Sequence, residues 1–163
     1  MHEICGHVPM FADKHVAVRI FLLQEVSHRI GLMSLGASDE QIAKLAAIYW
    51  WTIEFGVAKQ GNKHLAYGAG IAGCIEEMKH LMSDKARFKK LEPMVDCYAT
   101  YPVQSVQEMY RVTEDFEEAL EELSEFGKTI EKPVNTSFNF ETKTVEYDRN
   151  IEGIDFGDKG PKF

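Results

Sequence analysis

The first third of the chain carries a hydrophobic pattern that predicts two helices separated by a turn. Residues 16–30 are apolar enough for a buried helix, and residues 34–38 (SLGAS) have the composition of a turn. Ser38 follows as an N-cap, with Gln41 three residues later as its capping-box partner. We therefore expect a new helix to begin directly after Ser38.

Three helices are predicted downstream of this cap. Apolar residues recur with the i, i+3, i+4, i+7 spacing of an amphipathic helix from Ile42 to Val57, and this helix is expected to stop near Gly61 and Asn62. The glycine-rich residues 66–70 (AYGAG) open a helix that runs through Met82. Thr113 caps a further helix, and the run of glutamates on its outer face is typical of a solvated surface.

Strands are predicted in one place only. From Val134 to Tyr147, alternating and β-branched residues predict two short strands around Glu141 and Thr142. The expected fold class is therefore mainly α, a helical domain with a small β-hairpin element. Its length suits one domain with a real core, residues 1–149, followed by a loose polar tail over residues 150–163.

The composition of the chain limits which classes of binding partner we expect. The net charge of −8 argues against nucleic-acid binding, because phosphate contacts need a surplus of Lys and Arg. No apolar run is long enough to span a bilayer, so no membrane partner is expected. The three cysteines cannot form a full disulfide framework, which favours a reducing, cytoplasmic location.

The segment HEICGH at residues 2–7 holds two histidines, a glutamate and a cysteine, which are all potential metal ligands. The zinc-protease motif HExxH places its histidines four apart, on one helix face. Here His2 and His7 are five apart, roughly 140° around an ideal helix, so one ion can bind both only if the helix ends between them. Gly6 and Pro9 favour such an ending. A zinc hydrolase is therefore a weak alternative.

Glu54 is the best candidate for a third ligand. It lies on the flank of an apolar helix face, one turn after Trp50, where a carboxylate is costly unless it is paired or bound to metal. Two imidazoles and one carboxylate form the facial triad of non-haem Fe(II) oxygenases. Taken singly, each of these residues is more often structural than ligating. Cys5 is a further possible ligand, although a small packed residue is its commoner role.

Four segments, in order, resemble the pterin-dependent aromatic amino acid hydroxylases, the family of phenylalanine, tyrosine and tryptophan hydroxylases. They are HEICGHVPM (2–10), IGLMSLGAS (30–38), YWWTIEFG (49–56) and AYGAG (66–70), and the resemblance continues to about Tyr147. It implies that His2, His7 and Glu54 are iron ligands. It implies pterin-side positions at Glu3, Ala46 and Tyr49, and substrate-side positions at Trp50, Phe55, Gly70, Gly73 and Tyr101.

The resemblance implies iron(II), tetrahydrobiopterin and dioxygen as the reaction's cofactors and co-substrate, and hydroxylation of an aromatic amino acid. Trp50 favours the phenylalanine or tyrosine enzymes, since tryptophan enzymes tend to carry Phe there. Val103 stands where a tyrosine enzyme would have Asp, so phenylalanine is the preferred substrate, with tyrosine and tryptophan as alternatives.

The sequence also departs from the family. The residues expected upstream of His2 are missing, so we expect an N-terminally truncated catalytic domain, and a non-catalytic remnant that only binds metal is the alternative function. Residues 18–24 (VRIFLLQ) resemble an insertion of about two helical turns. Gly73 replaces a serine whose hydroxyl supports a ligating histidine and the substrate. The tail from Ile151 to Phe163 lacks the family's oligomer-forming heptad helix.

Overall fold

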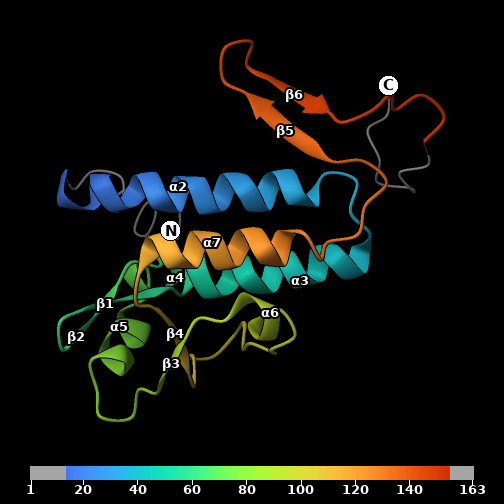
Figure 1. Ribbon diagram of the computed structural model, residues 1–163. Coiled ribbons are helices and arrows are strands. Elements are labelled where there is room, and N and C mark those ends of the chain that lie inside the picture. Colours follow the sequence, from blue (N-terminus) through green and yellow to red (C-terminus); the bar gives the residue numbers. More distant parts are fainter. Residues whose placement is uncertain (1–13, 155–163) are drawn as a thin grey trace.

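Long helices form the upper layer of the computed structural model, which describes residues 14–154. They are α2 (Lys14–Ser34), α3 (Asp39–Tyr49) and α7 (Phe116–Gly127), and their axes run nearly alongside one another in Figure 1. The predicted helix over residues 16–30 is confirmed, and α2 continues without a break through the segment 18–24. The three helices bury a shared core that includes Leu23, Val26, Ile30, Leu45, Ile48, Leu123 and Phe126.

Helix α3 begins where the sequence predicts, but it ends earlier than predicted. The Ser38 hydroxyl accepts a hydrogen bond from the backbone N–H of Gln41 at 3.4 Å, which caps the helix. After Tyr49 the chain makes one turn of π-helix, η2 (Trp50–Glu54), in which the backbone N–H of Phe55 donates to the Trp50 carbonyl at 2.8 Å. The prediction of a helix through residue 57 is therefore wrong in its last part.

A mixed sheet lies beneath the helices, and it makes the fold α/β. Its strands are β1 (Val57–Gln60), β2 (Lys63–Ala66), β3 (Phe88–Lys90) and β4 (Tyr110–Thr113), in the order β2-β1-β4-β3. Strands β1 and β2 are antiparallel, whereas β4 runs parallel to both β1 and β3. The expectation of a mainly α fold is wrong. The β1–β4 pairing joins residues more than 50 apart and leaves no local pattern, and the residues of β1 fall at the end of a stretch predicted to be helical.

Two helix boundaries also differ from prediction. The expected helix over residues 66–82 is divided into α4 (Ala69–Ala72) and α5 (Ile75–Leu81) by a break at Gly73 and Cys74. Thr113 belongs to strand β4, and the residue that caps α7 is Asp115, whose carboxylate accepts from the backbone N–H groups of Glu117 and Glu118. The short helix α6 (Pro93–Asp96) precedes a long loop that returns to β4.

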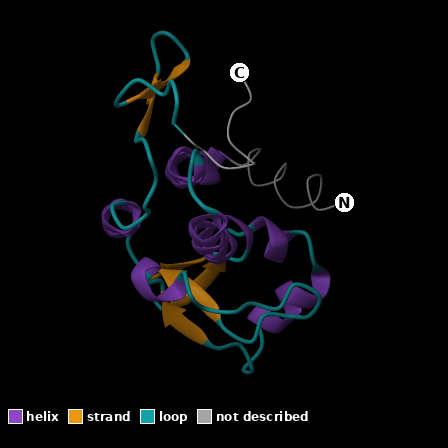
Figure 2. Cartoon of the chain, turned by 90° about the vertical axis from the view of Figure 1, so that its right-hand side faces the viewer, coloured by secondary structure: helices purple, strands orange, loops and turns teal. Residues whose placement is uncertain are grey.

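The predicted hairpin is confirmed as β5 (Thr136–Asn139) and β6 (Thr144–Tyr147), an antiparallel pair. It projects away from the sheet and beyond α2 in Figure 2. The Leu32 carbonyl at the end of α2 accepts from Lys132 Nζ at 2.9 Å and from Thr136 Oγ1 at 2.6 Å, which ties the hairpin to the helical layer. Among residues 14–154, no helix is both long and apolar enough to cross a membrane.

Candidate functional site

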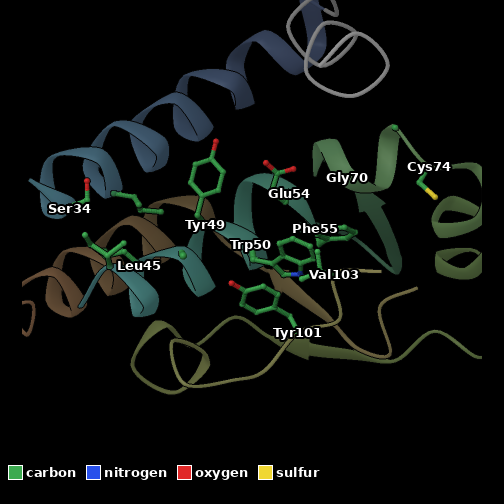
Figure 3. Close-up of a pocket in the computed structure, with 14 residues that line it drawn as sticks. Ser34, Leu45, Tyr49, Trp50, Glu54, Phe55, Gly70, Cys74, Tyr101 and Val103 are labelled. Carbon is green, nitrogen blue, oxygen red and sulfur yellow. The ribbon is translucent and has the colours of Figure 1, made fainter. Parts of the chain in front are cut away.

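A cavity of about 720 Å³ lies where α2, α3 and η2 face α4 and the loop after α6. Its wall is mostly apolar and aromatic, and Figure 3 shows the side chains that line it. Every predicted site residue that the structure describes belongs to this wall: Ala46, Tyr49, Trp50, Glu54, Phe55, Gly70, Gly73 and Tyr101. The cavity as a whole is lined by four separate segments of the chain, which is the arrangement that a shared ligand site requires.

Glu54 is the acidic residue of that wall. It stands at the last position of the π-turn η2, it is half-buried, and its Oε2 atom is shielded from solvent. Single turns of π-helix such as η2 are rare and recur at functional sites, where they redirect side chains. A carboxylate held in such an apolar setting is suited to bind a cation.

The AYGAG segment packs directly on the backbone that carries Glu54. A Cβ placed on Gly68 would lie 2.4 Å from the Glu54 carbonyl oxygen and 2.6 Å from the Gly56 nitrogen. A Cβ on Gly70 would lie 2.7 Å from the Phe55 ring and 3.0 Å from the same carbonyl oxygen. These glycines permit a close approach that larger residues would prevent, so the segment fixes where η2 ends.

Neighbouring Tyr67 closes this packing from the other side. Its hydroxyl shares a hydrogen bond with the Thr113 hydroxyl at 3.0 Å, and burial raises the pKa of Tyr67 to about 12. The ring leans on Phe116 of α7 at a centroid distance of 5.5 Å. Tyr67 thereby joins the glycine segment to both the sheet and the helical layer.

Three aromatic rings form a stack along the cavity. The Trp50 ring lies 4.5 Å from Phe55 and 4.6 Å from Tyr101, with interplanar angles of 27° and 19°. Figure 3 shows Trp50 between the other two rings. Trp50 therefore stacks against two other rings of the cavity wall, and offset stacking is one of the preferred aromatic geometries.

Two residues that the sequence did not single out hold this stack in place. The Gln107 side chain accepts from Trp50 Nε1 at 3.0 Å, and the Gln107 backbone N–H donates to the carboxylate of Glu77 at 3.1 Å. Both residues are buried, at 1% and 3% exposure. Their partners are 57 and 30 residues away in sequence, so no local pattern could reveal them.

The predicted ligands His2 and His7, and the predicted pterin contact Glu3, lie outside the described residues. Within residues 14–154, no group of three or more His, Cys, Asp or Glu side chains could hold a metal. The described chain thus supplies one carboxylate, Glu54, which fits iron as the third member of a two-histidine set. The complete ligand set stays a prediction.

The described residues form an α/β domain whose largely apolar and aromatic cavity holds one acidic side chain, Glu54, and such a cavity is a candidate site for a small molecule. Over residues 1–156 the sequence matches the model of the biopterin-dependent aromatic amino acid hydroxylases, and the chain belongs to this family. The family's reaction depends on biopterin, and membership implies iron and tetrahydrobiopterin as the cofactors.

Relatives with different substrates are similar to this chain. It is 43% identical over 153 residues to tryptophan 5-hydroxylase of Xenopus laevis, covering 94% of the chain and 30% of the relative. It is 40% identical over 145 residues to phenylalanine-4-hydroxylase of Dictyostelium discoideum, covering 89% and 31%. The chain therefore spans about a third of the length of these relatives.

The fold is also shared with a solved structure. Phenylalanine hydroxylase from Legionella pneumophila superposes with a TM-score of 0.65 at 28% identity, over 78% of this chain and 48% of that one. The described part of this chain thus shares its fold with part of that enzyme.

Proposed function

We propose that this chain forms the iron and substrate side of an aromatic amino acid monooxygenase, with His2, His7 and Glu54 as the iron ligands. The observation that carries the proposal is the common cavity. Glu54 and the substrate-side residues Trp50 and Phe55 are neighbours in sequence, and Gly70 and Tyr101 from two later segments line the same cavity. Iron and tetrahydrobiopterin, when bound, supply the reducing activation of dioxygen that ring hydroxylation needs.

The chain's own residues have three tasks in this proposal. Glu54 and the two histidines would hold the iron, which would supply the activation of dioxygen. The stack of Phe55, Trp50 and Tyr101 orients the substrate ring by aromatic contact and keeps water from it. Ala46 and Tyr49 of α3 line the same cavity, and we assign them to the pterin side.

The preferred substrate is phenylalanine. Trp50 supplies a large ring on the substrate wall, and Val103, at the cavity's edge, is apolar and 71% exposed. A polar or charged group at that position would disfavour an unsubstituted phenyl ring, because the group would lose water without gaining a hydrogen bond. Tryptophan is the second candidate, favoured by the 43% identity to the Xenopus laevis tryptophan 5-hydroxylase.

A competition assay separates the two substrates. The protein as its gene encodes it is supplied with Fe(II), tetrahydrobiopterin, dioxygen and an equimolar mixture of phenylalanine and tryptophan. We expect tyrosine to form faster than 5-hydroxytryptophan. Faster 5-hydroxytryptophan formation would reverse the substrate assignment, whereas no product from either amino acid would favour the non-catalytic alternative.

A further inference from the structure

The side-chain amide of Gln107 joins the substrate wall to the loop that covers it. Its oxygen accepts from the indole N–H of Trp50 at 3.0 Å, and its Nε2 donates to the Pro102 carbonyl at 2.8 Å. Tyr101, directly before Pro102, stacks on the same indole. One buried amide therefore sets both the rotation of the Trp50 ring and the height of the Tyr101 ring above it.

Gln107 is itself held by a buried carboxylate. Glu77 accepts from the Gln107 backbone N–H at 3.1 Å and from the Tyr110 hydroxyl at 2.6 Å. Two causes raise the pKa of Tyr110, first its burial and second the neighbouring Glu77 carboxylate, so this hydroxyl keeps its proton. A carboxylate that is 3% exposed is costly unless hydrogen-bonded, so these two donors fix Glu77 and, through it, the position of Gln107.

We propose that Gln107 is a positioning residue for the substrate wall: it orients Trp50 through the indole N–H and the Tyr101 loop through Pro102. This inference rests on the proposed function. It follows from the amide's chemistry, because the position demands an acceptor for the indole N–H and a donor for a carbonyl at once. An apolar side chain of equal length would leave both of these part-buried groups without this hydrogen bond.

The test replaces Gln107 with methionine, which has a similar length and neither a strong donor nor a strong acceptor. The matched control is Gln104→Met, the same change at an exposed position in the same loop. We expect Gln107→Met to raise the KM for the amino acid by about tenfold with a smaller change in kcat, because substrate orientation is lost. Gln104→Met should leave both constants unchanged.

A spectroscopic readout needs no activity. In the unmodified protein the indole N–H of Trp50, assigned by the loss of its NMR signal in Trp50→Phe, should exchange slowly with solvent. In Gln107→Met the same signal should shift and exchange faster. If Gln107→Met does not fold, slow exchange in the unmodified protein supports the hydrogen bond and fast exchange overturns it.

A double variant then separates positioning from general damage. In the Trp50→Phe background no indole N–H remains, so Gln107→Met should raise the KM by clearly less than it does alone. An equal rise in both backgrounds would overturn the proposal, as would an unshifted indole signal in Gln107→Met. If the protein binds phenylalanine without hydroxylating it, the dissociation constant for phenylalanine replaces the KM in the same comparison of variants. That outcome would contradict the proposed function, and the comparison would still test the role of Gln107.

Discussion

Gly68 should be a position at which even the smallest side chain does harm. Its backbone angles, φ −69° and ψ 136°, suit any residue, so the cost of Gly68→Ala is purely steric. The new Cβ would lie 2.4 Å from the Glu54 carbonyl oxygen and 2.6 Å from the Gly56 nitrogen. These are backbone atoms, which can move only if η2 moves with them.

The size of the effect follows from what the Cβ meets. Overpacking in a tight core costs about 1–3 kcal/mol, and we expect Gly68→Ala at or above about 3 kcal/mol because no side chain can rotate aside. Gly70→Ala meets mainly the Phe55 ring, at 2.7 Å, and should cost roughly 1–2 kcal/mol. Gly31→Ala, in the exposed face of α2, meets nothing within 4 Å and should stabilise by up to about 1 kcal/mol.

Urea unfolding of the three variants and the parent measures this series, with thermal midpoints as a second probe. The midpoints should fall by roughly 3 °C for each kcal/mol lost in a domain of this size. Iron affinity should drop in Gly68→Ala beyond the loss of stability, because the displaced backbone carries Glu54. A Gly68→Ala variant as stable as Gly31→Ala would refute the claim that close backbone packing fixes the end of η2.

Further predictions concern charged and titrating groups. Arg111→Met should cost about 3 kcal/mol in urea unfolding, because Asp96, 1% exposed, would lose its 2.7 Å partner; a loss below 1 kcal/mol contradicts this. The neutral Tyr67 phenol stabilises the fold fully below pH 10 and ever less as pH rises towards 12; absorbance titration should show one tyrosine near 12 that Tyr67→Phe removes. Hydrogen bonds from Arg149, the larger cause, and from Asn135 hold the pKa of Asp148 below its ordinary 3.8. The hairpin should therefore lose stability as pH falls below that value, and Asp148→Asn should flatten this pH dependence in acid unfolding.

Local patterns predicted the helices well and the sheet poorly. The Ser38 cap is a contact within three residues, and it was foreseeable because its hydrogen bond is local. Strand β4 is buried at all four positions and so lacks the alternation that marks a half-exposed strand. Val57 fitted the helical period by coincidence, and in the sheet it lies between Ala66 of an antiparallel strand and Val112 of a parallel strand.

The residues that line the site could be predicted from the sequence, whereas the residues that hold them in place could not. The motifs YWWTIEFG and AYGAG each contribute to the cavity wall, and resemblance to a family identified them without any geometry. Gln107 and Glu77 act through hydrogen bonds that depend on the loop's path between α6 and β4. A glutamine in a polar loop has no periodicity, so its burial becomes visible only in the folded chain.

Anaerobic titration with Fe(II) tests the central claim most directly. The parent protein should bind one Fe(II) per chain, and Glu54→Gln, His2→Ala and His7→Ala should each weaken binding by at least about tenfold. Glu121→Gln removes a carboxylate from an exposed face of α7 and should bind iron like the parent. Undiminished iron binding by Glu54→Gln would contradict the assignment of Glu54 as a ligand, and with it the site proposed for this cavity.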